Sequence, residues 1–276
     1  MTLDRMWLLG VARAEREGLG RTVQYTDPQA WDNESACEGW RVRDVLAHLA
    51  ASEVAAAALL GGETATEIEE FAKTVDGDEV TLDGFNEWSV RRRAETGVRS
   101  VALEWGRAAD LLLARASKTS AEDWTESRVA WFGADLRTGD FIQYRVAQWW
   151  IHGSDILTGG MLPPRIEHPP IYCVNDLAVR LLPYSLSLKG LSFSDRSVAI
   201  DLQAVGGGSW HQGLAARYAP PEGKRPDAII SGRALAFAEV AAGRTDADLC
   251  LYDGVLQLGG DVELAETALK SLRTSP

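Results

Sequence analysis

The chain has 276 residues, of which 46% are hydrophobic and 25% charged, a composition typical of a soluble globular protein with one or two domains. Its net charge of -12 argues against nucleic acid as a partner, because an acidic surface repels phosphate backbones. Three isolated cysteines argue against a disulfide framework and fit a reducing, cytoplasmic location. No apolar run is long enough to span a membrane, and the first residues lack the pattern of a signal peptide.

Hydrophobic periodicity predicts that the first part of the chain is mainly helical. We expect a short acidic helix within residues 63–78, and loops over 25–38 and 124–136, the second of which is a candidate lid. The long helices are expected over residues 3–18, 41–60, 82–116 and 140–157. Gly97 is expected to bend the third of them. Four long amphipathic helices predict an antiparallel bundle.

Two proline pairs after residue 160 mark a candidate linker, beyond which the pattern changes. A helix is expected over 171–188, kinked by Pro183. Further helices are expected over 234–242 and 261–272, and strands over 197–202, 209–212, 227–231, 249–251 and 255–258. The fold class predicted is therefore α+β: a four-helix bundle in residues 1–165 and a small α+β domain in residues 166–276.

Two predicted helices carry the residues that could form a site. Gln148 and His152 lie four residues apart, so they share one helix face, and Arg145 and Asp155 flank them on that side. His48 lies on the inner side of the second helix, where Asp44, one turn earlier, could orient it or begin the helix as a solvated acid. Spacing alone leaves open whether the histidines are ordinary core residues or metal ligands. Nearby tryptophans, Trp40 and Trp149 among them, could line an apolar pocket.

Two of these segments resemble motifs of the mycothiol-dependent maleylpyruvate isomerase family, which is part of the DinB-like superfamily. They are Cys37–Leu49, CEGWRVRDVLAHL, and Arg145–Asp155, RVAQWWIHGSD. The run Trp131-Phe132-Gly133 is similar to an actinobacterial metal-binding branch of that family. Residues 241–244 and 258–261 resemble its second domain, which is similar to sterol carrier proteins. The resemblance covers nearly the whole chain.

The resemblance implies a bundle with a zinc-type site made by two histidines and one glutamate. His48 and His152 match the two histidine ligands, but Gln148 stands where the family has glutamate. A divalent metal could bind through Gln148, could bind with Asp44 or water instead, or could be absent. Glutamine offers only a neutral oxygen, whereas zinc in catalytic sites prefers histidine, cysteine or carboxylate ligands.

The resemblance also implies a reaction in which the thiolate of mycothiol, or of a similar small thiol, adds to a conjugated double bond and is later eliminated. Arg145 and Arg244 are candidates for holding substrate carboxylates, with ion pairs to nearby acids, Asp155 in the case of Arg145, as the alternative. Asp155 is a candidate to orient His152, and the cysteines are expected to be packing residues.

We therefore expect a metal-assisted, thiol-dependent isomerase or S-transferase that acts on a small electrophilic substrate. The alternatives are a metal-free enzyme that uses His48 and His152 as acid and base, and a non-catalytic protein that binds a small molecule. The expected partner is a small molecule rather than a membrane or nucleic acid, and the chain is expected to be a monomer or a homodimer.

Overall fold

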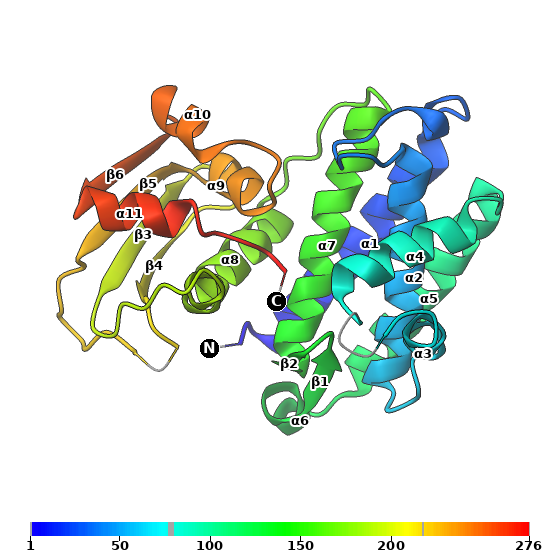
Figure 1. Cartoon of the computed structure of the whole chain (residues 1–276), viewed down its shortest axis with the longest axis horizontal. Helices are drawn as coiled ribbons and strands as arrows, with labels where there is room; N and C mark the ends of the chain where they lie inside the picture. The colour runs from blue at the N-terminus through cyan, green and yellow to red at the C-terminus, as the bar shows by residue number, and fades with distance from the viewer. Residues whose placement is uncertain (1, 77–79, 217, 276) are drawn as a thin grey trace. The chain divides into compact units, whose positions relative to one another are not determined.

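The computed structural model describes residues 2–76, 80–216 and 218–275, which form two compact units, Met1–Arg165 and Ile166–Pro276 (Figure 1). The first unit is helical, and the second contains a small sheet with helices. The predicted α+β fold class is confirmed.

Four long helices form the body of the first unit: α1 (Arg5–Tyr25), α2 (Val42–Leu60), α5 (Val98–Lys118) and α7 (Thr138–Gly159). Helix α2 packs against α5 and α7, and α1 packs against the same two helices. Alanine supplies much of the buried surface of α2, so neighbouring helices approach its backbone closely. Helix α7 is buried on nearly all of its faces, which places its polar side chains inside the bundle.

The remaining elements of the first unit are short. They are the 3-10 turn Ala30–Asp32, α3 (Thr66–Ala72), α4 (Leu82–Arg93), α6 (Ala121–Glu126), β1 (Arg128–Trp131) and β2 (Ala134–Arg137). Helix α3 lies within the predicted range 63–78, of which residues 77 and 78 are outside the described part of the chain.

Two sequence predictions in this unit are wrong. The helix expected over 82–116 is broken into α4 and α5, because Gly97 adopts an extended conformation and serves as the N-cap of α5 instead of bending a continuous helix. The loop expected over 124–136 contains the end of α6 and an antiparallel hairpin, β1–β2. Phe132 and Gly133 form its turn with positive φ angles of 43° and 84°, so Val129 and Trp131 face the core.

The C-terminal end of α7 packs tightly against the segment that precedes α2. A Cβ atom added at Gly159 would lie 2.4 Å from Val42 Cγ2 and 2.8 Å from the carbonyl oxygen of Glu34. We therefore expect Gly159→Ala to lower the free energy of unfolding by about 1–3 kcal/mol, the usual range for overpacking. Gly10→Ala is the matched control, because nothing lies within 4 Å of its added Cβ, and it should raise stability by up to about 1 kcal/mol. Urea unfolding measures both, and equal effects would contradict this packing.

The second unit begins with α8 (His168–Leu188), which contains Pro183. Its sheet has the order β4-β3-β5-β6, in which β3 pairs parallel with β5 and the outer pairs are antiparallel. The strands are β3 (Ser197–Gln203), β4 (Gly208–Gly213), β5 (Ala228–Arg233) and β6 (Leu256–Gly260), and the helices that follow are α9 (Ala234–Ala241), α10 (Ala247–Tyr252) and α11 (Val262–Leu269).

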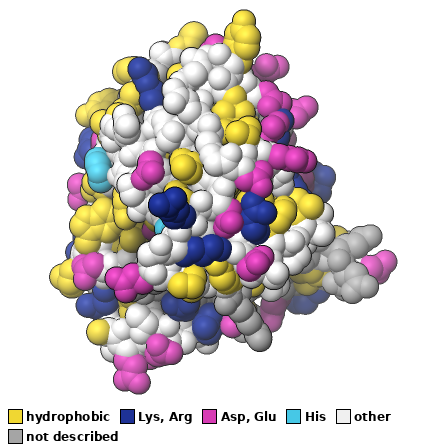
Figure 2. All heavy atoms as spheres, turned by 90° about the vertical axis from the view of Figure 1, so that its left-hand side faces the viewer, with side chains coloured by type: hydrophobic (Ala, Val, Ile, Leu, Met, Phe, Trp, Pro, Cys, Tyr) yellow, Lys and Arg dark blue, Asp and Glu magenta, His cyan; other side chains and the backbone are white. Residues whose placement is uncertain are grey.

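The strand expected over 249–251 is also wrong, because these residues lie in α10. The side chain of Asp246 accepts a hydrogen bond from the backbone nitrogen of Asp248 at 2.6 Å, which caps the helix start. Within the described residues, no helix is long and apolar enough to cross a membrane. On the face that Figure 2 shows, basic side chains occur in small groups among acidic and hydrophobic ones. The predicted absence of a nucleic-acid partner stays a prediction.

Candidate functional site

The packing of α2 against α7 brings together the two histidines that the sequence singled out. The ring centroids of His48 and His152 lie 4.8 Å apart, in an edge-on arrangement with an interplanar angle of 73°. Both residues are buried, with 4% and 8% of their surface exposed. Two imidazoles this close can share one ligand or one metal ion.

His152 is held by a carboxylate one turn further along α7. Its Nδ1 lies 2.8 Å from Oδ2 of Asp155, which is buried, so when the ring is neutral Nδ1 carries the proton and Nε2 is the acceptor. The thiol of Cys37 donates to the same carboxylate oxygen at 3.2 Å, and its sulfur lies 3.9 Å from Nδ1. The expectation that Cys37 is merely a packing residue is wrong, since its half-buried thiol contacts the site.

His48 lies in a drier environment than an ordinary surface histidine. Its ring packs 5.3 Å from that of Trp40, whose Nε1 donates to Glu87 at 2.9 Å, and its own Nδ1 is buried without a hydrogen-bond partner among the described residues. Burial, and then the charges of His152 and Arg145, lower the pKa of His48 well below its ordinary value. The ring is therefore neutral at neutral pH.

The depressed pKa of His48 makes stability depend on pH. Above about pH 6.5 the ring is neutral in both folded and unfolded chains; below it, only the unfolded chain takes up a proton readily. We expect metal-free protein to lose up to about 1.4 kcal/mol per pH unit as the pH falls from 6.5 towards the folded pKa. Urea unfolding at pH 7.5, 6.5 and 5.5 should give a shallower dependence for His48→Gln than for wild type. Parallel curves would show that His48 does not titrate differently on folding.

Two polar residues next to the histidines, Gln148 and Asp44, differ in their hydrogen bonds. Gln148 lies one turn before His152 on α7, is 8% exposed, and makes no hydrogen bond among the described residues. Asp44 accepts from the backbone nitrogen of Arg41 at 2.9 Å and from its side chain at 3.2 Å. Asp44 therefore caps the start of α2, and it is buried instead of solvated as the alternative interpretation of the sequence expected. Gln148 is the side chain left for a ligand.

Arg145 forms its ion pair with a buried acid, Glu53, and not with Asp155. Its Nε and Nη2 donate to Oε1 of Glu53 at 3.0 and 2.5 Å, and the indole of Trp149 donates to the same oxygen at 2.7 Å. The guanidinium carbon lies 5.6 Å from the ring centroid of Trp131. Arg145 Nη1 and Glu53 Oε2 are buried without a hydrogen-bond partner in the described structure. The sequence analysis did not predict this pair. The signal that could have revealed it is Glu53 itself, a single acid in an alanine-rich, buried helix.

Arg244 belongs to the second unit, where it follows α9. Its Nη1 donates to the carbonyl oxygen of Ala242 at 2.8 Å, so the guanidinium is anchored locally. Its role towards a substrate carboxylate stays a prediction.

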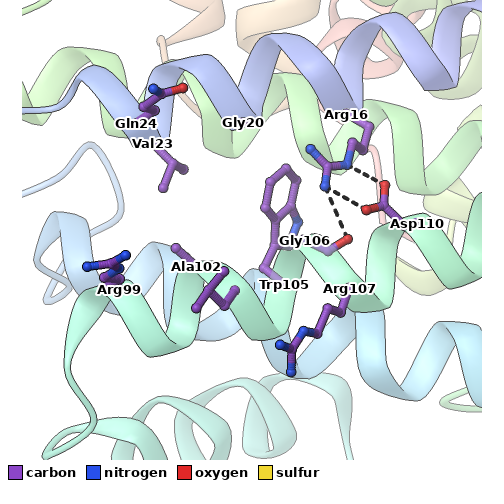
Figure 3. A pocket seen from close by; sticks show the side chains of 11 residues that line it. Arg16, Gly20, Val23, Gln24, Arg99, Ala102, Trp105, Gly106, Arg107 and Asp110 are labelled. Carbon is purple, nitrogen blue, oxygen red and sulfur yellow. Dashed lines mark hydrogen bonds and ion pairs between the residues drawn. The ribbon is translucent and has the colours of Figure 1, made fainter.

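A pocket of about 340 Å³ lies elsewhere in the bundle, between α1 and α5 (Figure 3). The Trp105 ring stands between the two helices, and Arg16 donates to Asp110 at 2.6 and 2.8 Å and lies 5.4 Å above that ring. Neither histidine nor cysteine occurs among its lining residues. We therefore assign these contacts to helix packing and place the candidate site at the histidine pair.

The residues present fit a divalent metal ion. His152 has the carboxylate partner on its other nitrogen that metal-bound histidines usually have, and His48 is neutral with a buried, unpaired nitrogen. Cys37, His152 and Asp155 also offer three ligand atoms within 4.8 Å of one another. The unusual feature is the third position beside the histidines, where Gln148 supplies a neutral oxygen.

Comparison with known proteins identifies a family and structures of the same fold. Residues 12–157 match the family model described as the mycothiol maleylpyruvate isomerase N-terminal domain. Two uncharacterized proteins from two strains of Mycobacterium tuberculosis are each 21% identical over 243 residues, covering 85% of this chain and 89% of theirs. A crystal structure of the mycothiol-dependent maleylpyruvate isomerase superposes with a TM-score of 0.60 at 18% identity, covering 89% of this chain and 91% of that one. A histidine-to-alanine mutant of it gives 0.61 at 16%, with 94% and 95% covered.

Proposed function

The chain belongs to the mycothiol maleylpyruvate isomerase N-terminal domain family, and from this premise we propose that it is a thiol-dependent enzyme of the isomerase type. The observation that carries the proposal is the meeting of His48 and His152 at 4.8 Å between ring centroids, with His152 held by Asp155. The thiol is mycothiol or a similar small thiol, and the substrate is a small molecule with a conjugated, electron-poor double bond.

The histidine pair would hold a cation. His48 and His152 would hold a divalent metal, zinc in the first instance, with the side-chain oxygen of Gln148 as a third donor. When bound, such an ion lowers the pKa of a thiol and stabilises negative charge that develops on the substrate. Asp155 keeps the His152 ring oriented, and the neutral His48 offers a ring nitrogen to the ion.

Cationic and aromatic side chains would bind the rest of the ligands. Arg145 uses one edge of its guanidinium for Glu53, and its Nη1, which is buried and has no hydrogen-bond partner among the described residues, is retained as a candidate for a substrate carboxylate. We retain Arg244 as a second carboxylate-binding candidate. Trp40 packs on His48 and is the better placed to contact the thiol cofactor of the two tryptophans predicted to line the pocket, because Trp149 is 1% exposed and bonded to Glu53.

A metal-free enzyme on the same scaffold is the second candidate. Gln148 supports it, since a neutral amide stands at the family's glutamate position, one turn before His152. In that case His48, neutral at neutral pH, would be the base and His152 the acid. Chelator treatment separates the candidates: it should abolish turnover by the metal-assisted enzyme and leave the metal-free enzyme unaffected.

Product analysis tests the proposed reaction type. The protein is incubated with maleylpyruvate and mycothiol, and the products are separated and weighed by mass spectrometry. An isomerase gives a product of unchanged mass and returns the thiol, whereas an S-transferase gives an adduct that contains both. The His48→Ala/His152→Ala double variant is the control and should give neither. The absence of both products from wild type would contradict the proposal.

A further inference from the structure

The pocket between α1 and α5, called the α1–α5 slot below, is a second place where a small molecule fits. Its volume of about 340 Å³ lies within the usual range of ligand sites in proteins. We propose that the α1–α5 slot binds a small aromatic carboxylate. This site is separate from the proposed function, because no residue assigned to the reaction lines the slot.

Glycine residues on both helices keep the slot open. Gly20 on α1 and Gly106 on α5 both line it. A Cβ atom added at Gly20 would lie 3.1 Å from Nη1 of Arg16 and 4.0 Å from the Trp105 ring, so a longer side chain there would enter the slot. A Cβ atom added at Gly106 would lie 3.2 Å from Nη2 of Arg16. The space between the helices therefore depends on two positions that carry no side chain.

The walls of the slot are apolar and aromatic. Val23 points from α1 towards α5, Ala102 lies on α5, and the Trp105 ring stands between the two helices (Figure 3). An indole wall favours an aromatic ligand, because aromatic rings attract one another in offset and edge-on arrangements. The ion pair between Arg16 and Asp110 closes the end beyond Trp105 (Figure 3). The slot is therefore shaped for a planar, apolar body that enters from the opposite end.

The open end of the slot carries positive charge that no acid of the described structure balances. Arg99 and Gln24 lie at this end (Figure 3), and Arg99 makes no ion pair or hydrogen bond among the described residues. Three arginines and one aspartate line the slot, so its lining has a net charge of +2 in a protein of net charge -12. A guanidinium binds a carboxylate through two parallel hydrogen bonds, and the amide of Gln24 can donate a third. These groups favour an anionic head on the ligand.

Isothermal titration with 2-naphthoate tests this site, with the neutral 2-naphthylmethanol as the matched ligand. We expect wild type to bind one 2-naphthoate per chain and to bind the alcohol about 10-fold more weakly, because the alcohol lacks the charged hydrogen bonds. Gly20→Leu fills the slot and should abolish binding. Gly10→Leu, also on α1 but with nothing within 4 Å of its added Cβ, should leave binding unchanged.

Charge is tested in the same titration. Arg99→Gln should weaken binding of 2-naphthoate about 10-fold, and Arg91→Gln, which removes an exposed arginine of α4, should not change it. Circular dichroism shows which variants are folded. The His48→Ala/His152→Ala variant should bind 2-naphthoate like wild type, since neither histidine lines the slot.

Four results would overturn the inference. Wild type may fail to bind 2-naphthoate, or it may bind the alcohol equally well, in which case the slot is not a site for an anion. Unchanged binding by folded Gly20→Leu, or by Arg99→Gln if Gly20→Leu does not fold, would place the ligand elsewhere on the protein. Loss of binding in the double histidine variant would place it at the histidine pair. The titration needs no turnover, so its outcome is independent of the proposed reaction.

Discussion

Replacing Glu53 by alanine should lower the free energy of unfolding of the protein by about 3–5 kcal/mol, the usual cost of leaving a buried charge without its partner. Glu53 is fully buried, and its Oε1 accepts hydrogen bonds from Arg145 and Trp149. The guanidinium would remain between α2 and α7 with no anion to balance it. Urea-induced unfolding, followed by circular dichroism and tryptophan fluorescence, measures the loss.

Glu63→Ala is the matched control for this prediction. Glu63 also pairs with an arginine, Arg115, at 2.5 Å, but 61% of its side chain is exposed to solvent. An exposed pair contributes about 0–1 kcal/mol, so this variant should unfold close to wild type. Glu53→Gln keeps the shape of the side chain, and it should lie between wild type and Glu53→Ala if the latter still folds. Equal losses for Glu53→Ala and Glu63→Ala would show that burial of the pair has no energetic consequence.

The second large effect is expected on turnover. His152→Ala should lower the thiol-dependent rate by about 10²–10⁴-fold, because it removes a ligand of the proposed ion or, in the metal-free enzyme, a group that transfers protons. Asp155→Asn should cost less, about 10–100-fold, because it disturbs only the orientation of the ring. Initial rates at saturating thiol measure both variants.

His168→Ala is the corresponding control, since His168 is exposed at the start of α8 and stacks on Tyr172. It should retain the wild-type rate. If His152→Ala turns over as fast as His168→Ala, the histidine pair is not the site of the reaction.

Local patterns were enough to predict the long elements of the fold. The apolar spacing that predicts a helix over 41–60 matches α2, and that over 140–157 lies within α7. Glycine was harder to interpret, because Gly97 could bend a helix or begin one. The outcome depends on how α4 and α5 each pack against α2. The segments near Val129 and Leu249 are too short to show a reliable hydrophobic periodicity, so the hairpin was predicted as a loop and α10 as a strand.

The site was predictable to the extent that its residues share a helix face. Gln148, His152 and Asp155 lie on one side of α7, so their proximity follows from spacing. The partners that come from distant parts of the chain did not follow from it. Cys37 reaches Asp155 from the loop before α2, and Glu53 reaches Arg145 across the α2–α7 interface. Contacts of this kind depend on how helices pack, which a single sequence does not encode locally.

The dependence of turnover on thiol tests the central claim most directly. The initial rate of maleylpyruvate isomerisation is measured at increasing mycothiol concentrations for wild type and for the His48→Ala/His152→Ala variant. We predict a rate that rises from near zero to saturation for wild type and stays near zero for the variant. A wild-type rate that does not change with mycothiol, or a variant that responds to it like wild type, would contradict a thiol-dependent reaction at the histidine pair.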